Sequence, residues 1–569
     1  MKILGINLNH ISSAALISNS EIVAATSEER ISRIKLSREF PDNSIKFCLN
    51  KANISFDDLD AITIGWNPGI NLEIFKKSYS YTYRWFPELL YLIPNQILKL
   101  NNASFDHYIL QEFKSINLKK NLKIIYVNHH LSHAALSFLS SGFKNSGILT
   151  VDGFGERTST MWGKADKNKI EISKKIDFPQ SLGSFYETIT SFLGFTPDSD
   201  EWKVMGMAAY GDKKIYLKKI QKLIKLKSSG EYEIDLSYFN YFNFESPGHF
   251  NNKFIELFKD IPLNRKNLNK RHYDFAASAQ SIFEDVMFNA ISHLTKNNFK
   301  NICLSGGSIM NCLANARIAK KFKQKIFVPF APDDLGLSIG SAMYANQYIF
   351  KKRSKYEIKP FTGKEFSDRE IESKLKKYKI SYFKPKSFYN TLALELSKGK
   401  VISVVSGKSE FGQRALGNRS ILADPRSIKM KDIVNQKIKY RESFRPFAPV
   451  VLSKFLNKYF NCPPNIQPTY MQYAVEVKKI TMKIAPAIVH ADNTARVQSV
   501  DENTNQNLNK ILVEFFKLTK VPILLNTSFN LKGEPMVDTP EDAIKTFYTS
   551  GIDILALNNF IITKENEKN

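Results

Sequence analysis

The sequence predicts an α/β protein whose first domain is built from two similar halves and is followed by a second α/β domain. Residues Lys2–Arg30 read as three apolar strands joined by polar turns, and Gly147–Ser173 repeat that order of strand, polar turn and hairpin. Alternating apolar positions interrupted by Asn, Gly and Asp are typical of strands and hairpins. Because the unit occurs twice, we expect a duplicated domain with a ligand between its halves.

A third segment, Lys300–Phe322, reads as a strand, a Gly-Gly turn and a helix. Backbone amides at such a strand-to-helix junction can hold a phosphate or a nucleoside. With the two strand units, this segment resembles the nucleotide-binding fold shared by actin, sugar kinases and heat-shock chaperone ATPases. Residues 1–352 are therefore predicted to form one domain of that kind.

Beyond residue 352 the sequence becomes charged and irregular, which predicts a linker at 353–367. A second domain is predicted at 368–569. It begins with a helix near Asp368–Lys377 and contains the strand-like runs KVISVVS, YMQYAVEV and VPILLNTSF. A chain of 569 residues is long enough for two or more cores, and its 43% hydrophobic content is ample for them.

Composition favours a cytoplasmic protein. The four cysteines are far apart and form no C-x-x-C pair, which argues for reduced thiols and against a disulfide framework or structural zinc. The first residues read as a strand and turn, not as a signal peptide, and no apolar run approaches the length of a membrane span. Net charge is +26, but the lysines are scattered and form no long basic block, so we expect neither a nucleic-acid nor a membrane partner.

The run Glu410–Arg426, EFGQRALGNRSILADPR, predicts a buried anion site. It places Arg414, Arg419 and Arg426 among small turn residues, and the planar fork of arginine suits bidentate contact with phosphate or carboxylate. Gly412 and Gly417 would let the backbone approach such a ligand closely. A solvated charged face is the alternative, but such faces rarely interleave arginine with Gly, Ala, Leu and Ile. The run therefore points to a phosphorylated small molecule.

Three of the nine histidines fall within VNHHLSHAALSFL, at a predicted helix start. His129 and His133 are four residues apart, so they share a helix face and could bind one metal ion. Asp152 and Asp334 are candidate oxygen ligands because each follows an apolar strand in a glycine-containing loop, although Asp333 remains an alternative to Asp334. A set of two His and two Asp fits iron, manganese or zinc.

The glycine spacing of the loop Asp152-Gly153-Phe154-Gly155-Glu156 suits backbone contact with phosphates. Asn311 and Asn315 lie one helical turn apart after the Gly-Gly turn and could bind ribose or base, with helix capping as the alternative. His10 follows the first strand at the position that Asp152 occupies in the second unit, which makes it the candidate general base. Lys35 could add positive charge nearby, or could be a plain surface lysine.

Anion-binding residue types recur in the second block, where ordinary surface cations are the alternative. Several fixed cations around one pocket would bind a phosphate and stabilise charge on a departing group. The candidates are Lys439, Arg441, Arg445, Arg496, Asn526 and Ser528.

The chain resembles the ATP-dependent O-carbamoyltransferases of the nodulation, cephem and tobramycin type. The matching motifs occur in order from residue 1 to about 550: HHLSHA, DGFGE, KVMGMAAYG, LSGGSIMNCLAN, EFGQRALGNRSILADPR, KYRESFRPFAP, TARVQ, and NTSFN with KGEP. Three residues depart from the usual pattern. Ile11 replaces an Asp, Trp202 a Gly and Gln413 a Pro, and the first two put the identity of the acceptor in doubt more than the core reaction.

The resemblance implies a TsaD-like first domain and a YrdC-like second domain. It implies that the second domain binds carbamoyl phosphate, that ATP is converted to carbamoyl adenylate, and that the carbamoyl group passes to a hydroxyl near an iron centre. Fe(II), or Mn or Zn at the same site, would be held by His129, His133, Asp152 and Asp334, and Mg²⁺ is a further candidate cofactor. Residues 152–156, Asn311 and Asn315 would contact the nucleotide, and His10 would take the proton of the hydroxyl. The residues implied to hold carbamoyl phosphate are Arg414, Arg445, Arg496, Asn526 and Ser528, with Lys35 nearby.

The expected acceptor is a small molecule, namely a sugar, a glycan precursor or an antibiotic-like compound. The aromatic-rich regions Trp66–Leu100 and Leu236–Asn251 are the candidate acceptor surfaces. Two alternatives remain open: a threonylcarbamoyl-type tRNA-modifying enzyme, which the +26 charge keeps alive, and a non-catalytic protein that binds ATP and metal. A homodimer is one option for the assembly.

Overall fold

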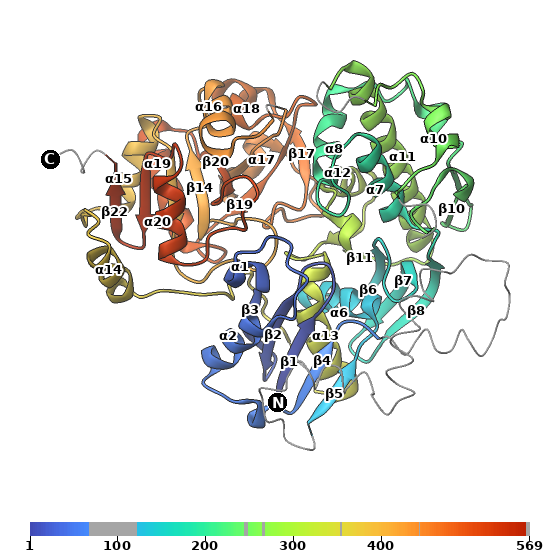
Figure 1. The fold of residues 1–569 in the computed structure, drawn as a ribbon, viewed down its shortest axis with the longest axis horizontal. Helices are drawn as coiled ribbons and strands as arrows, with labels where there is room; N and C mark the ends of the chain where they lie inside the picture. The colour runs from blue at the N-terminus through green and yellow to red at the C-terminus, as the bar shows by residue number, and fades with distance from the viewer. Residues whose placement is uncertain (68–121, 244–247, 264–267, 353–354, 443, 565–569) are drawn as a thin grey trace. The chain divides into compact units, whose positions relative to one another are not determined.

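The computed structural model describes residues 1–67, 122–243, 248–263, 268–352, 355–442 and 444–564 (Figure 1). It divides into two compact units. Unit 1 comprises Met1–Ala24 and Arg38–Glu357, and unit 2 comprises Ala25–Ser37 and Ile358–Asn569. The change from one unit to the other at residue 357 lies inside the predicted linker. The segment Ala25–Ser37 corrects the predicted division, because it belongs to unit 2 and not to the first domain.

Unit 1 contains two five-stranded sheets with the same topology. The first has the order β3-β2-β1-β4-β5, in which β1 is antiparallel to β2 and parallel to β4, and β4 is parallel to β5. Its strands are β1 (Lys2–Asn7), β2 (Ser13–Ser18), β3 (Glu21–Ser27), β4 (Ala61–Ile64) and β5 (Lys123–Tyr126).

The second sheet has the order β12-β11-β6-β7-β8. Here β6 is antiparallel to β7 and parallel to β11, and β11 is parallel to β12. Its strands are β6 (Asn145–Val151), β7 (Thr158–Asp166), β8 (Ile170–Asp177), β11 (Asn301–Ser305) and β12 (Lys325–Phe327). Each sheet is a three-stranded meander extended by two parallel strands, which confirms the duplicated α/β domain.

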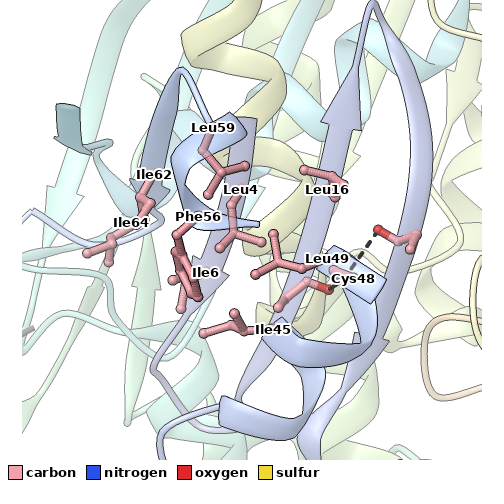
Figure 2. Close-up of a cluster of buried hydrophobic side chains, with 12 residues drawn as sticks. Leu4, Ile6, Leu16, Ile45, Cys48, Leu49, Phe56, Leu59, Ile62 and Ile64 are labelled. Atoms are coloured by element: carbon pink, nitrogen blue, oxygen red, sulfur yellow. Dashed lines mark hydrogen bonds between the residues drawn. The ribbon is translucent and has the colours of Figure 1, made fainter. Parts of the chain in front are cut away.

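The first sheet is buried on one side under helix α2 (Asp42–Ala52), as Figure 2 shows. Ile45 and Leu49 of this helix join Leu4, Ile6 and Leu16 of the strands in one apolar cluster. The Sγ of Cys48 lies 3.5 Å from the carbonyl oxygen of Ala14. All four cysteines are free thiols, as predicted.

Helices α6 (His129–Ser141) and α13 (Leu337–Tyr344) cross at very short range. A Cβ on Gly340 would stand 2.1 Å from the carbonyl oxygen of Ser132, and a Cβ on Gly5 would stand 1.8 Å from that of Ser338. Glycine is therefore required at 340, where α13 crosses α6, and at 5, where β1 packs against α13. This packing holds the start of α6 close to the 3-10 turn Asp334–Gly336 that precedes α13.

The remaining helices of unit 1 lie in the chain between β8 and β12 of the second sheet. The longest, α11, begins at the capping residue Asn269, whose side chain accepts from the backbone amide of Arg271. The helices are α7 (Leu182–Phe192), α8 (Glu201–Met207), α9 (Leu217–Ile220), α10 (Asn252–Leu257), α11 (Lys270–Thr295) and α12 (Cys312–Lys321), and a short ribbon is formed by β9 (Ile224–Leu226) and β10 (Tyr232–Ile234).

Unit 2 is built on a mixed seven-stranded sheet of order β19-β15-β20-β14-β13-β21-β22, accompanied by the three-stranded sheet β16-β17-β18. The strands are β13 (Ile402–Val405), β14 (Arg419–Ala423), β15 (Ala448–Leu452), β16 (Phe460–Asn461), β17 (Ala474–Val477), β18 (Thr494–Arg496), β19 (Gln498–Val500), β20 (Ile523–Ser528), β21 (Ile554–Leu557) and β22 (Phe560–Thr563). The predicted runs KVISVVS, YMQYAVEV and VPILLNTSF are thus confirmed as β13, β17 and β20.

Helices α1, α14 and α15 of unit 2 precede β13 in the chain, and its other helices lie between later strands. The predicted helix near residue 368 is observed as α14, with Ser367 as its cap. The helices are α1 (Glu28–Ser32), α14 (Asp368–Lys377), α15 (Phe388–Ser397), α16 (Lys429–Ile433), α17 (Leu456–Tyr459), α18 (Lys479–Ile484), α19 (Gln506–Thr519) and α20 (Pro540–Tyr548). In the described part of the chain, every helix is too short or too polar to cross a membrane.

Candidate metal centre and anion site

The four side chains proposed as metal ligands converge in unit 1. Ligand atoms of His129, His133, Asp152 and Asp334 all lie within 4.8 Å of one another. Nε2 of His133 is 2.9 Å from Oδ2 of Asp152 and 3.5 Å from Oδ1 of Asp334. Nε2 of His129 is 3.4 Å and 3.7 Å from the same two oxygens. Both imidazoles are fully buried, whereas the carboxylates of Asp152 and Asp334 are 14% and 18% exposed. We call these four residues the metal-type cluster.

The start of α6 is held in place by Glu156 and Asn128. Oε1 of Glu156 accepts from the backbone amide of His129 at 2.9 Å, and Oε2 accepts from the side-chain amide of Asn128 at 2.7 Å. Asn128 in turn caps the helix by accepting from the amide of Leu131. The carboxylate that sequence reasoning assigned to nucleotide binding therefore also orients His129.

Contacts within the cluster shift the pKa values of His133 and Asp152 in opposite directions. Burial alone would lower the pKa of His133, but hydrogen bonds and charges from Asp152 and Asp334 raise it to about 9. The pKa of Asp152 lies well below its ordinary value, because the two histidines outweigh the effect of its burial. His130 differs, since burial lowers its pKa to about 3, and its ring nitrogens contact Thr150 and the carbonyl of Thr158.

The geometry favours Asp334 over Asp333 as the ligand. Asp334 reaches both histidines, whereas Asp333 stands at the N-cap position of the 3-10 turn and does not belong to the cluster. Burial and the charge of Asp334 raise the pKa of Asp333 to about 7. The donor set of two imidazoles and two carboxylates fits a divalent transition metal of borderline softness.

The loop 152–156 lies directly against this cluster. The backbone amides of Gly153 and Gly307 both donate to the Asp152 carboxylate, at 2.8 Å and 3.1 Å. Phe154 is 46% exposed, and its ring packs against Trp66 and Phe178. An exposed aromatic ring beside a metal-type cluster offers a stacking surface for a planar ligand.

The two asparagines after the Gly-Gly turn are engaged within the protein. Asn311 caps α12 by accepting from the amide of Ala314, and it exchanges hydrogen bonds with Gln280 at 2.9 Å and 3.0 Å. Asn315 is buried and donates to the carbonyl of Ile309. The capping alternative that the sequence left open is thus observed for Asn311.

His10 follows β1 and lies in unit 1, where Arg38 and Asp198 flank it. Nδ1 of His10 is 2.9 Å from Nη2 of Arg38, and because a guanidinium only donates, Nδ1 accepts this hydrogen bond. The same nitrogen is 3.9 Å from Oδ2 of Asp198. Sequence reasoning found His10 but missed both neighbours, which are distant from it in the chain.

The three arginines of the run Glu410–Arg426 lie in different surroundings. Arg419 is fully buried and donates to the carbonyl oxygens of residues 364, 406, 407, 418 and 538. Arg426 pairs with Asp424 at 2.6 Å and is part-exposed. These two serve the fold, which corrects the interpretation of all three as anion ligands. Arg414 stands half-buried on the loop between Gly412 and Gly417, whose φ values of 104° and 118° require glycine.

That loop is closed by a single carboxylate. Oε1 of Glu410 accepts from the backbone amides of Leu416, Asn418 and Arg419, at 2.8 Å, 2.9 Å and 3.1 Å. Sequence reasoning missed this residue. A buried acid at the start of a glycine-containing loop is the signal that could have identified it.

Five cations of unit 2 influence one another. Burial, followed by the charges of Arg441, Lys35 and Arg445, holds the pKa of Lys439 well below its usual range. Burial and the charges of Arg445 and Arg496 lower the pKa of Arg441 to about 9. We call Lys35, Lys439, Arg441, Arg445 and Arg496 the cation cluster. Within the cluster, Nε of Arg445 pairs with Oε2 of Glu442 at 2.5 Å.

Lys439 ties the cluster to the end of β20. Its Nζ lies 2.5 Å from the carbonyl of Ser528 and 2.7 Å from Oδ1 of Asn530. Asn526 is buried and donates to the carbonyl of Ala415 and to Gln498, at 3.2 Å and 2.8 Å. Neither Asn530 nor Gln498 was predicted. Of the candidate acceptor surfaces, 68–100 and 244–247 lie outside the described residues.

Comparison with known proteins defines the class as a transferase. Residues 2–343 match the family model "Carbamoyltransferase N-terminus", and residues 393–564 match "Carbamoyltransferase C-terminus". The chain belongs to the carbamoyltransferase family.

The relatives span nearly the whole chain. It is 35% identical to "Uncharacterized protein sll1178" of Synechocystis sp., with 99% of this chain and 96% of that protein covered. It is 33% identical to "Nodulation protein NolNO" of Sinorhizobium fredii, with 98% and 79% covered. Among solved structures, T. kodakarensis HypF matches with a TM-score of 0.35 and 15% identity over 62% of this chain and 48% of that one, too low to carry an argument.

Proposed function

We propose that this carbamoyltransferase uses carbamoyl phosphate and ATP to carbamoylate a hydroxyl group of a sugar or natural product. The observation that carries the proposal is that one carbamoyltransferase chain contains two clusters. Unit 1 holds the cluster of two histidines and two aspartates, and unit 2 holds the cation cluster. Five cations held together in a folded domain favour a polyanionic ligand, since an anion relieves their mutual repulsion.

The first step belongs to unit 2. Its cation cluster, with Arg414, would bind the phosphoryl group of carbamoyl phosphate and stabilise the charge that builds on phosphate as it departs. Water adds to the carbamoyl carbon, the C–O bond to phosphate breaks, and carbamate and inorganic phosphate result. Asn526 and Ser528 would orient the carbamoyl end, because an amide group needs both donors and acceptors.

The second and third steps belong to unit 1. A carbamate oxygen attacks the α-phosphorus of ATP and expels pyrophosphate, and the resulting mixed anhydride is a far better carbamoyl donor than carbamate. The acceptor hydroxyl then attacks the carbamoyl carbon and releases AMP. The loop 152–156 would contact the nucleotide, with a planar base against the exposed ring of Phe154.

A divalent metal bound by His129, His133, Asp152 and Asp334 would supply Lewis-acid stabilisation of phosphate charge. His10 would receive the acceptor proton at Nδ1, the nitrogen that accepts from Arg38 in the free protein. The acceptor hydroxyl would therefore take the place of the Arg38 donor. Resemblance to nodulation, cephem and tobramycin carbamoyltransferases supports a sugar or antibiotic-like acceptor.

The test is a product analysis. Purified protein is incubated with ATP, carbamoyl phosphate and a panel of sugars and aminoglycosides, and masses and nucleotides are measured together. The proposal expects an acceptor that gains one carbamoyl group while AMP and pyrophosphate appear in equal amounts. Formation of ADP in place of AMP would contradict the adenylate route.

A further inference from the structure

Two charged side chains of unit 1 meet at one ring nitrogen of His10. Nη2 of Arg38 is 2.9 Å from Nδ1 of His10 and 3.5 Å from Oδ2 of Asp198. Nδ1 and Oδ2 are themselves 3.9 Å apart. A nitrogen acceptor, a cationic donor and a carboxylate acceptor thus lie together, although their residues are distant in the chain.

All three side chains can be reached by a ligand. Their exposed fractions are 26% for His10, 66% for Arg38 and 53% for Asp198. Ion pairs that are exposed to this degree contribute little to stability. The contact between Arg38 and Asp198 can therefore rearrange readily when a ligand competes for either partner.

Asp198 extends from a short loop with a defined backbone. Its φ is 61°, a left-handed value that is uncommon outside glycine, and its amide donates to Oε1 of Glu201 at 2.9 Å. Oδ2 of Asp200 accepts from the amide of Thr196 at 3.2 Å and lies 2.7 Å from Nζ of Lys203. Because non-glycine residues keep such a conformation only where surrounding contacts hold them, the backbone at Asp198 is fixed before a ligand binds.

An exposed indole belongs to the same loop. Trp202, in the first turn of α8, is 36% exposed, and its Nε1 donates at 3.0 Å to the carbonyl of Ser199, the residue after Asp198. A sugar combines an apolar C–H face, which packs on aromatic rings, with a polar edge of hydroxyls. An aromatic ring on the loop that carries the carboxylate therefore favours a sugar over a purely apolar alcohol.

The hydrogen-bonding capacity of these groups matches two neighbouring hydroxyls. Once the attacking hydroxyl takes the place of Arg38 at Nδ1 of His10, the guanidinium can donate elsewhere, and an ionised Asp198 can only accept. A second hydroxyl can accept from Arg38 and donate to Asp198 at the same time. Hydroxyls on adjacent carbons, or one carbon further apart, lie about one hydrogen-bond length from each other, which suits the short distances among the three protein groups.

We propose that Arg38 and Asp198 bind the hydroxyl beside the one that is carbamoylated, so that the acceptor is a 1,2- or 1,3-diol of a sugar. The first hydroxyl oxygen bonds to the carbamoyl carbon, the C–O bond to AMP breaks, and the hydroxyl proton passes to Nδ1 of His10. The inference rests on the proposed function, because it takes His10 to be the base that receives this proton. Arg38 and Asp198 are then the residues that select which hydroxyl faces His10.

The test begins with wild-type protein and a change in the acceptor. Methyl glycosides of glucose, mannose and N-acetylglucosamine are compared with their monodeoxy analogues in the presence of ATP, carbamoyl phosphate and Fe(II). AMP release gives kcat and KM, and mass spectrometry locates the carbamoyl group. Loss of the hydroxyl beside the modified one should lower kcat/KM about 10- to 100-fold, because it removes hydrogen bonds to charged groups. Loss of a more distant hydroxyl should have little effect.

The same comparison is then made with Asp198→Ala and Arg38→Ala. Each variant should lower kcat/KM for the diol about 10-fold and leave kcat/KM for the deoxy acceptor unchanged, because that acceptor already lacks the contacted hydroxyl. The matched control is Asp57→Ala, which removes an exposed aspartate elsewhere in unit 1 and should change neither value. The melting temperature of each variant separates loss of folding from loss of specificity.

Two results would overturn the inference while wild type carbamoylates sugars. One is a deoxy acceptor, lacking the neighbouring hydroxyl, that reacts as well as the diol. The other is an equal loss of kcat/KM for both acceptors in Asp198→Ala and Arg38→Ala, which would show that these residues only support the fold around His10. Failure of wild type to carbamoylate any of the glycosides would instead remove the sugar acceptor from the proposed function.

Discussion

The metal-type cluster of unit 1 and the cation cluster of unit 2 differ in the signs of the charges that they bring together. In unit 1, the carboxylates of Asp152 and Asp334 face the imidazole of His133 and raise its pKa to about 9, against the effect of burial. In unit 2, like charges gather, and their repulsion together with burial lowers the pKa values of Lys439 and Arg441. We propose a divalent cation as the ligand of the first site and a phosphorylated anion as the ligand of the second.

The two sites also differ in how the chain assembles them. The metal-type cluster takes two ligands from one helix face and two from loops after strands of the duplicated domain. The cation cluster takes its members from segments separated by up to 461 residues, from Lys35 to Arg496. Local sequence patterns can therefore reveal the first site almost completely, but only suggest the second.

The largest expected effect is on the metal-type cluster. Asp152→Ala removes one of the two carboxylates that contact both histidines. It should weaken Fe(II) or Zn²⁺ binding at least about 100-fold, because even the loss of a residue that only supports a metal ligand weakens metal affinity by up to about that factor. Metal content after dialysis is the measurement. The matched control is His130→Gln on the same helix, which should keep its metal. Equal metal loss in both variants would show that folding, not ligation, was disturbed.

The next largest effect is expected on protein stability, where substitutions of Arg419 and Arg414 should differ. Arg419→Met leaves several buried carbonyls without donors and should destabilise the protein by about 3–5 kcal/mol, as for other buried charge networks. Chemical denaturation measures this change. Arg414→Ala, on the loop before β14, should change stability by less than about 1 kcal/mol. It should weaken the binding of phosphonoacetamide, a stable phosphonate analogue of carbamoyl phosphate. Equal destabilisation by both substitutions would contradict the division of roles.

The sequence predicted the duplicated fold and the quartet of unit 1 because both depend on short-range signals. Strand alternation, the i, i+4 spacing of His129 and His133, and loops ending in Asp are visible within a few residues. Arg419 was misread because its role depends on carbonyls at 364, 406 and 538, which no local pattern connects. The segment 25–37 was placed in the first domain for the same reason. Its Arg33 donates to the carbonyl oxygens of Pro535 and Met536, which are 502 and 503 residues further along the chain.

A smaller effect is expected on the pH dependence of anion binding. Because the pKa of Lys439 is lowered in the free protein, its neutral form gains population as pH rises, whereas a bound anion favours the ammonium form. Binding of phosphonoacetamide in the alkaline range should therefore take up at most about one proton, and affinity should fall as pH increases. Calorimetry in two buffers of different ionisation enthalpy measures the uptake. An uptake that persists in Lys439→Met would assign it to another group.

The smallest effect is expected at Arg426. Its pair with Asp424 is part-exposed, and such pairs contribute about 0–1 kcal/mol. Arg426→Ala should change neither phosphonoacetamide binding nor the free energy of unfolding by more than that amount. A strong loss of binding in this variant would restore the whole run as an anion site.

The most direct test of the account is ATP–pyrophosphate exchange in the metal-replete protein, with and without carbamoyl phosphate, on wild type and Arg414→Ala. The account predicts exchange that requires carbamoyl phosphate in wild type and is lost in the variant, because the anion site of unit 2 must supply carbamate before ATP reacts. Exchange that proceeds without carbamoyl phosphate, or that is unaffected in Arg414→Ala, would contradict it.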